Sequence, residues 1–222
     1  MKTYFIVVAG GKGQRMGSQI PKQFLPIEGT PLIIRTLENI RKAVPEAEIL
    51  LVLGKAAQEH WENISKNTSF ADLTVAIGGK NRTESVKSGL ELVKEDSIVA
   101  IHDAVRPFVS KNCIIQTLEA AKVNGAAIPV VPLTETIRMK EDSSSIALDR
   151  DKYCLVQTPQ CFRSDIIKSA YEQLTSAFTD DASVVEAAGC KIALTEGNVE
   201  NIKITTQKDL WIADSILKMQ KD

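Results

Sequence analysis

The sequence predicts an α/β fold in which an open, mostly parallel β-sheet carries helices on both faces. Short apolar runs rich in β-branched residues alternate with amphipathic stretches, as strands alternate with crossover helices in such folds. The length of 222 residues suits one domain with an excursion, and an apolar content of 44% is enough for a full core. No internal repeat or low-complexity linker divides the chain, so residues 1–222 are predicted to form one domain.

Buried strands are predicted where the apolar runs are too short for helices. They cover residues 4–9, 48–53, 74–77, 97–101 and 126–131. Their alternation with helices makes the predicted fold Rossmann-like. In open α/β sheets, ligands bind at the carboxyl ends of the strands, so functional residues are expected directly after these runs.

Helices are predicted from apolar positions three or four residues apart and from capping residues. Thr30 is expected as an N-cap with Pro31 at the first helical position, while Ser110 and Gly125 should begin and end another helix. Further helices are predicted around residues 86–93 and over residues 164–177, 181–188 and 206–219.

Residues 133–156 break the alternation. Residues 134–140 read as an exposed strand, residues 141–145 as a turn, and residues 146–149 as extended chain. This predicts a protruding β-arm that is too polar to hold a core of its own. A surface loop and an arm ordered by a partner subunit explain the pattern equally well.

Composition excludes several classes of protein. The 27 Lys and Arg residues nearly balance 28 Asp and Glu residues, which argues against a nucleic-acid partner. No apolar run approaches the roughly 18 residues that span a bilayer, so no membrane partner is expected. The chain begins with a predicted strand rather than a signal peptide, and its four cysteines form neither a C-x-x-C pair nor a dense framework. We therefore expect a cytoplasmic protein with reduced thiols.

The first predicted strand runs into a glycine-rich turn that contains Gly10, Gly11 and Gly13. Backbone N–H groups in such a turn can hold phosphate oxygens. The turn is not a Walker A loop, because no Gly-Lys-Ser/Thr follows at the required spacing. It is not a dinucleotide fingerprint either, because Met16 stands where the third glycine belongs.

Cations gather around this turn at Lys12, Arg15 and Lys22. A tight strand-to-helix turn would explain the glycines but not the cations. Cations beside a glycine-rich turn suit a triphosphate whose α-phosphorus is attacked, because they stabilise the charge that develops on its oxygens. Pro21 restrains the backbone beside Lys22, which favours a functional role for that lysine.

Two later segments hold further candidates. Asp103 is expected just past a strand end, where its carboxylate can bind Mg²⁺, and Arg106 can hold a phosphate through two hydrogen bonds. A buried Asp–Arg pair that closes the loop explains the same spacing, and His102 is expected to be structural. Lys203 is predicted at the centre of a short strand over residues 201–205.

Seven motifs follow one another in a fixed order along nearly the whole chain. They are Ala9-Gly10-Gly11-x-Gly13-x-Arg15-Met16, Pro21-Lys22-Gln23-Phe24-Leu25, Gly78-Gly79-x-x-Arg82-x-x-Ser85-Val86, His102-Asp103-Ala104-x-Arg106-Pro107, Gln157-Thr158-Pro159-Gln160, Thr179-Asp180-Asp181-Ala182-Ser183 and Asn201-Ile202-Lys203-Ile204-Thr205. Together they resemble the 2-C-methyl-D-erythritol 4-phosphate cytidylyltransferase family. Gly10 and Val105 depart from this pattern, because alanine is common at both positions in the family.

The resemblance implies that CMP is transferred from CTP to the phosphate of 2-C-methyl-D-erythritol 4-phosphate with release of pyrophosphate, a step of non-mevalonate isoprenoid biosynthesis. It also implies that Mg²⁺ or another hard divalent cation is required. The glycine-rich turn and residues 102–107 are similar to ribitol-5-phosphate cytidylyltransferases as well, so another polyol phosphate stays open as the acceptor. A nucleotide-binding module without turnover is a more distant alternative, and a Rossmann oxidoreductase is the weakest.

Roles for individual residues follow from the resemblance. Arg15 and Lys22 would stabilise the transition state, and Arg150 and Lys203 complete the implied catalytic set. CTP would be bound by Ala9, Gly10, Gly11, Gly13, Lys22, Gly78, Gly79 and Ser85. The acceptor would be bound by Asp103, Arg106, Thr136, Arg150, Thr158, Thr179 and Lys203, with Asp103 also beside the metal.

The family's arm matches residues 133–156 and is exchanged between the subunits of a homodimer. By resemblance, Thr136 and Arg150 would therefore reach into the site of the neighbouring subunit.

Overall fold

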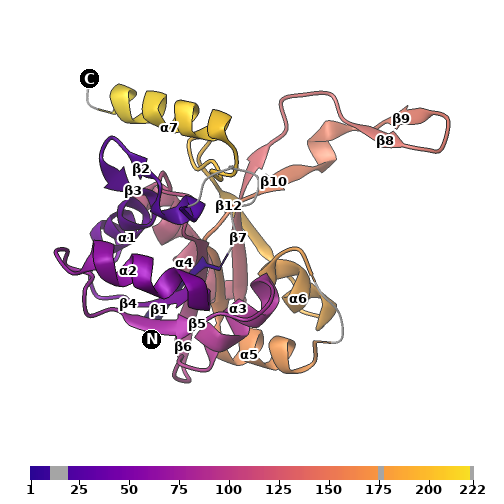
Figure 1. The fold of residues 1–222 in the computed structure, drawn as a ribbon. Coiled ribbons are helices and arrows are strands. Elements are labelled where there is room, and N and C mark those ends of the chain that lie inside the picture. Colours follow the sequence, from indigo (N-terminus) through magenta and orange to yellow (C-terminus); the bar gives the residue numbers. More distant parts are fainter. Residues whose placement is uncertain (11–19, 175–177, 221–222) are drawn as a thin grey trace.

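A twisted eight-stranded sheet runs through the centre of the computed structural model, which describes residues 1–10, 20–174 and 178–220 (Figure 1). One half of the sheet is parallel and consists, in spatial order, of β6 (Ser97–Asp103), β1 (Lys2–Ala9), β4 (Glu48–Leu53) and β5 (Thr74–Ile77). These strands lie where the apolar runs predicted them.

The other half of the sheet is mixed and consists of β11 (Gln160–Arg163), β7 (Ala126–Pro132), β10 (Cys154–Val156) and β12 (Ala193–Glu196). β11 lies antiparallel between β6 and β7, β10 is antiparallel to β7, and β12 is parallel to β7. Because β10 and β11 are the described strands of this sheet that run against the others, the predicted mostly parallel sheet is confirmed. β11 was not predicted, because Gln160 and Arg163 enclose only two apolar residues and no apolar run marks the strand.

Helices cover both faces of the sheet, as predicted. α1 (Leu32–Ala43), α2 (Gln58–Ser65) and α4 (Lys111–Asn124) pack on one face, and α3 (Arg82–Leu90), α5 (Ser164–Glu172) and α6 (Asp181–Ala187) on the other. Side chains of β1 alternate between these two cores: Phe5 and Val7 enter the first, and Tyr4 and Ile6 the second. This period of two is what a strand buried on both faces requires.

A third, smaller core lies beneath α7 (Gln207–Met219), where Ala213 and Leu217 pack with Ile27 and Ile204. Thr206 begins α7 with a capping box, in which its hydroxyl accepts a hydrogen bond from the backbone N–H of Asp209. The core matters for function because it holds the segment that carries Lys203 against the rest of the domain.

The prediction for the start of α1 is wrong. Thr30 and Pro31 form β3 (Thr30–Pro31), which pairs with β2 (Pro26–Ile27), and the helix begins at Leu32. Glu28 and Gly29 both have positive φ and close the tight turn between these strands, so Thr30 is extended and its side chain caps nothing. By contrast, the predicted limits of α4 are confirmed, with the Ser110 hydroxyl capping its start and Gly125 in a left-handed conformation at its end.

Other helix limits differ modestly from the prediction. The helix expected around residues 86–93 is α3, which ends at Leu90, and the one expected over residues 164–177 is α5, which ends at Glu172. α6 and α7 lie where expected. The short helix α2 was not predicted, because polar residues interrupt its apolar positions.

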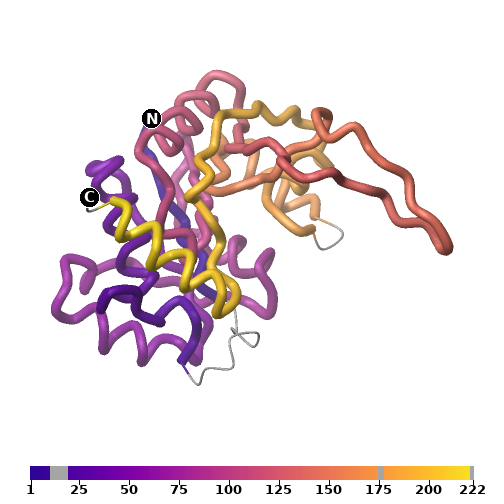
Figure 2. Tube along the Cα trace, turned by 90° about the horizontal axis from the view of Figure 1, so that it is seen from above, coloured from indigo at the N-terminus to yellow at the C-terminus, as the bar shows by residue number. Residues whose placement is uncertain are grey.

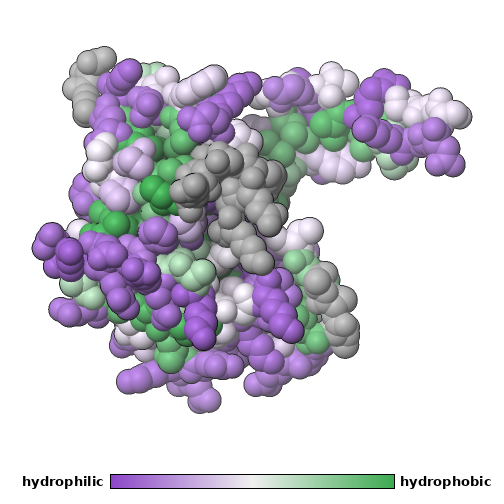
Figure 3. Space-filling view, viewed as in Figure 1, coloured by the Kyte–Doolittle hydropathy of each residue, from purple (hydrophilic) through white to green (hydrophobic). Residues whose placement is uncertain are grey.

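The arm leaves the domain as a hairpin built of β8 (Arg138–Lys140) and β9 (Ser145–Ala147), and both views show it extending away from the sheet (Figures 1 and 2). The space-filling view shows apolar residues at the surface where the arm joins the domain (Figure 3). Exposed apolar side chains on the arm and its base belong to Met139, Ile146, Tyr153, Leu155 and Val156.

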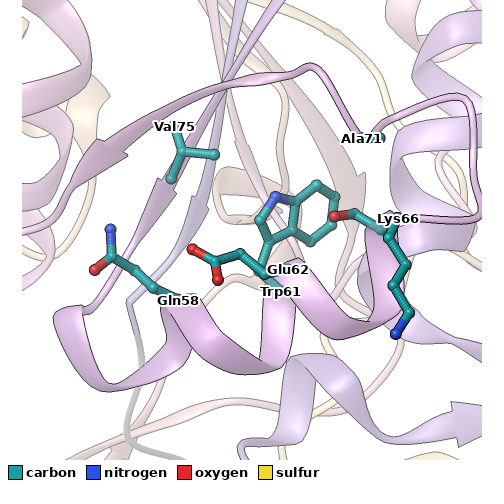
Figure 4. Close-up of a pocket in the computed structure, with 7 residues that line it drawn as sticks. Gln58, Trp61, Glu62, Lys66, Ala71 and Val75 are labelled. Carbon is teal, nitrogen blue, oxygen red and sulfur yellow. The ribbon is translucent and has the colours of Figure 1, made fainter.

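A cavity of about 260 Å³ lies beside α2 and β5 (Figure 4). Its lining consists of Gln58, Trp61, Glu62, Ser65, Lys66, Ala71 and Val75, none of which is a predicted site residue. In the described part of the chain, no helix combines the length and apolar character needed to cross a membrane.

Candidate functional site

The carboxyl ends of β1 and β5 meet over the first turn of α3. A Cβ atom added to Gly78 would lie 2.7 Å from the Ser85 hydroxyl oxygen, and one added to Gly10 would lie 3.2 Å from the same atom. A Cβ atom on Gly79 would collide with Glu84. The backbone therefore approaches Ser85 closely from two strands, and only glycine at position 78 permits this.

Lys22 is placed at this edge of the sheet by its neighbour in the sequence. The buried side chain of Gln23 donates a 2.8 Å hydrogen bond to the carbonyl of Ala9, which ties the short helix at Lys22–Phe24 to the end of β1. The ammonium of Lys22 then lies 3.4 Å from the carbonyl oxygen of Ile204. The Pro21-Lys22-Gln23 motif thus brings Lys22 next to the segment that carries Lys203.

Asp103 is the last residue of β6 rather than the residue after it, and three cations face its buried carboxylate. Its Oδ2 lies 2.9 Å from the Lys203 ammonium and 3.4 Å from Nε of Arg106, and its Oδ1 lies 3.7 Å from Nε of Arg82. Burial alone would raise the pKa of Asp103, but the charges of Lys203, Arg82 and Arg106 outweigh burial and hold the pKa well below 3.8. Asp103 is therefore ionised.

This geometry does not fit Asp103 as a direct metal ligand. Both carboxylate oxygens face cations, and a metal ion there would have to displace them or be repelled by them. Nor do the described residues contain any group of three His, Cys, Asp or Glu side chains placed to hold a metal ion.

Lys203 does not lie in a strand, contrary to the prediction, because residues 201–205 bond to the loop that follows β6 rather than to a strand. The backbone N–H of Ile204 donates a 3.0 Å hydrogen bond to Val105, and Ile204 is fully buried while Ile202 is partly buried in the core beneath α7. The two isoleucines anchor the extended segment, which leaves Lys203 between them to face Asp103.

A chain of hydrogen bonds fixes the backbone around Asp103. The backbone N–H of Asp103 donates to the Thr158 hydroxyl over 3.2 Å, and that hydroxyl lies 2.9 Å from Nδ1 of His102. Nε2 of His102 lies 3.1 Å from the carbonyl of Arg106, which can only accept, so Nε2 carries the proton and Nδ1 accepts from Thr158. Burial lowers the pKa of His102 to about 4, and the imidazole is neutral.

The segment around Asn201 is tied to the same residues. Arg106 donates a 2.7 Å hydrogen bond to the carbonyl of Asn201, and the Asn201 amide donates over 2.8 Å to the carbonyl of Thr158. Gln157 in turn donates over 2.9 Å to the carbonyl of Asn198. Three segments far apart in the sequence are thereby joined around Asp103.

Some predicted site residues lie apart from this cluster. Thr136 and Arg150 belong to the arm, residues 133–156, and Arg150 donates a hydrogen bond to the carbonyl of Thr134. Thr179 is exposed just before α6. Gly11, Gly13 and Arg15 lie outside the described residues.

Two residues of the cluster received no role from the sequence. Arg82 and Asp181 belong to two of the seven sequence motifs. They are 99 residues apart, so only the folded structure reveals that they form a bidentate pair. The sequence offered one indication of this pair: each of the two motifs contains a charged residue for which no partner had been assigned.

The family model for 2-C-methyl-D-erythritol 4-phosphate cytidylyltransferase, IspD, matches residues 3–219. The chain belongs to this family. Among its relatives, the protein of that name from Bacteroides fragilis is 49% identical over 215 residues, covering 96% of this chain and 98% of the relative. The one from Bacteroides thetaiotaomicron is 48% identical over 219 residues, covering 98% of this chain and 100% of the relative.

Solved structures of the family share the fold. The 4-diphosphocytidyl-2C-methyl-D-erythritol synthase of Anaerococcus prevotii superposes with a TM-score of 0.85 at 28% identity, covering 98% of this chain and 96% of that one. The 2-C-methyl-D-erythritol 4-phosphate cytidylyltransferase of Thermus thermophilus gives a TM-score of 0.79 at 31% identity, covering 98% and 100%. As a member of the family, the chain is a cytidylyltransferase of the non-mevalonate isoprenoid pathway.

Lowering the pH below 6.5 is expected to destabilise the fold through His102. The unfolded imidazole binds a proton near its ordinary pKa of 6.5, whereas the folded one does so only near 4. In this window the unfolded chain binds more protons, so the free energy of unfolding falls as pH falls, by at most about 1.4 kcal/mol per pH unit.

Urea denaturation at several pH values between about 5 and 6.5 measures this slope. We expect a smaller slope for His102→Gln and an unchanged one for the control His60→Gln, since His60 is exposed. A slope that is the same in His102→Gln as in the wild type would contradict the assignment.

Proposed function

We propose that this protein transfers CMP from CTP to the phosphate oxygen of 2-C-methyl-D-erythritol 4-phosphate and releases pyrophosphate. The observation that carries the proposal is the cluster of Lys203, Arg106 and Arg82 around ionised Asp103, at the carboxyl edge of the sheet. Its net charge is positive although the whole chain carries −1. A local excess of cations is what a reaction between a phosphomonoester and a triphosphate needs, because two anions must be brought together.

In this proposal the acceptor phosphate binds to Lys203 and Arg106, with Asp103 and Thr158 beside it. Its oxygen attacks the α-phosphorus of CTP in line, and the bond to pyrophosphate breaks. Lys22, together with Arg15 outside the described residues, stabilises the charge that develops on the α-phosphate oxygens. No covalent enzyme intermediate is needed, so the site requires no activated nucleophile of its own.

The donor pocket in this proposal lies over the start of α3. Ala9, Gly10, Gly78, Gly79 and Ser85 line it, continued by Gly11 and Gly13 outside the described residues. The close approach of Gly78 to Ser85 supports this assignment, because backbone groups and the hydroxyl oxygen of Ser85 can form hydrogen bonds with the edge of a cytosine.

We propose that turnover requires Mg²⁺ or another hard divalent cation, as expected for a family that uses CTP. Since Asp103 does not fit as its ligand, the oxygens of the triphosphate would hold the cation. Bound there, it would supply positive charge against the triphosphate.

We further propose that the protein is a cytoplasmic homodimer joined through the arm, without a nucleic-acid or membrane partner. Thr136 and Arg150 lie on the arm, so they would hold the acceptor in the partner subunit's site. The exposed apolar side chains of the arm support this, because such side chains mark surfaces that become buried on association.

Product formation with two acceptors tests the reaction itself. Incubation with CTP and Mg²⁺ should release pyrophosphate with 2-C-methyl-D-erythritol 4-phosphate and at most slowly with ribitol 5-phosphate. Equal or faster release with ribitol 5-phosphate would contradict the proposed acceptor, and CTP binding without product from either acceptor would contradict enzymatic function.

Mixed dimers test whether Arg150 acts across the interface. We expect Lys22→Ala and Arg150→Ala to be nearly inactive alone. Co-expressed, they should form heterodimers in which one site has both Lys22 and the partner's Arg150, restoring about a quarter of wild-type activity on statistical grounds.

The matched control is co-expression of Lys22→Ala with Lys203→Ala, whose residues lie in the same domain, and it should restore nothing. Absence of recovery in the first pair, with dimers confirmed by light scattering, would show that Arg150 acts within its own chain.

A further inference from the structure

A buried ionic network connects the Asp103 cluster to α6. Asp181, the first residue of α6, is fully buried, and its carboxylate accepts hydrogen bonds of 2.9 and 2.6 Å from the two terminal nitrogens of Arg82. The Tyr171 hydroxyl donates a third bond of 2.6 Å to the same carboxylate. A buried carboxylate without a cation would strongly destabilise the folded state. The carboxylate of Asp181 therefore holds the Arg82 side chain beside it.

The position of Asp181 is itself fixed through its backbone. The side-chain oxygen of Gln160 accepts from the N–H groups of Asp181 and Ala182 over 3.0 and 2.9 Å. The Gln160 amide donates over 2.8 Å to Asp180, the N-cap of α6. These bonds fix the backbone that carries Asp181 against β11, and turning its carboxylate away from Arg82 would also break the bond from Tyr171.

Arg82 places its Nε toward the candidate site. With both terminal nitrogens on Asp181, its Nε lies 3.7 Å from Oδ1 of Asp103. The other oxygen of Asp103 faces Lys203 and Arg106. The two oxygens are thus divided between the fixed cation on one side and the acceptor-binding cations on the other, and this division sets the orientation of the carboxylate.

A role of Arg82 in neutralising Asp181 alone does not account for the orientation of its guanidinium. The need to neutralise Asp181 would be met by an arginine in any orientation that reaches it. The observed orientation also presents Nε to Asp103 and leaves about a quarter of the side chain, 26%, exposed. Arg82 further lies one turn before Ser85, so the first turn of α3 touches both the proposed acceptor and donor pockets.

We propose that Arg82 is a positioning residue for the acceptor phosphate: held by Asp181 and Tyr171, it orients Asp103 and, through Asp103, Lys203 and Arg106. This inference rests on the proposed function of the Asp103 cluster.

Two variants separate positioning from folding. The double variant Arg82→Gln with Asp181→Asn removes both charges of the buried pair, so no uncompensated charge is left behind. Arg82→Lys keeps a cation for Asp181, but its single ammonium cannot also reach Asp103 as the guanidinium does. The matched control is Arg163→Gln with Asp165→Asn, which removes an exposed bidentate pair of 3.1 and 2.7 Å at the start of α5.

Steady-state kinetics with each substrate varied in turn gives the decisive readout. We expect both Arg82 variants to raise KM for 2-C-methyl-D-erythritol 4-phosphate about tenfold, because a charge-assisted contact that orients the site is lost. KM for CTP should change less than about twofold, and the control should change neither. Circular dichroism at the assay temperature should show both Arg82 variants fully folded, so their kinetic effect is not a folding effect.

Two results would overturn the inference. A rise in KM for CTP as large as that for the acceptor would place Arg82 in the donor pocket, and wild-type values of both KM would leave it a structural residue. Calorimetric titration of the same variants with 2-C-methyl-D-erythritol 4-phosphate measures acceptor affinity without turnover. A wild-type protein that binds this acceptor but forms no product would therefore contradict the proposed reaction while still testing the role of Arg82.

Discussion

The buried carboxylate of Asp103 is the constraint on which the candidate site depends. An ionised carboxylate at the end of a buried strand is tolerated only when cations and hydrogen-bond donors surround it. Lys203, Arg106 and Arg82 supply the cations. Asp181 holds Arg82 from the other side. Two buried negative charges thereby hold three positive charges in place, and the excess positive charge is available to an anionic substrate.

The fold supplies these groups from elements that the sheet and its cores bring together. β6 carries Asp103, α3 carries Arg82, and the core beneath α7 holds the segment of Lys203. His102, which is neutral, and Thr158 fix the backbone around Asp103 and Arg106 through hydrogen bonds and add no charge to the site. A carboxylate at a strand end most simply suggests a metal ligand. Because both oxygens of Asp103 face cations, we expect the divalent cation to be bound elsewhere.

Much of the architecture was predictable because strong local signals agreed with the tertiary structure. Dense apolar runs form β1, β4, β5, β6 and β7, and Ser110 and Gly125 mark the ends of α4 through capping chemistry. β11 and the hairpin before α1 were missed because their formation depends on neighbouring strands and on positive φ at Glu28 and Gly29. Asp103, Arg106 and Lys203 were predictable from their motifs, whereas the link from Arg82 to Asp181 joins distant segments and has no local pattern.

Substitution of Asp103 by asparagine tests most directly whether this residue anchors cations or binds metal. Turnover of Asp103→Asn is measured against Mg²⁺ concentration and against 2-C-methyl-D-erythritol 4-phosphate. If Asp103 anchors the cations, KM for the acceptor rises about tenfold or more, while the half-saturating Mg²⁺ concentration stays within about twofold of the wild type. A rise of about tenfold or more in half-saturating Mg²⁺, with an unchanged KM for the acceptor, would contradict this account.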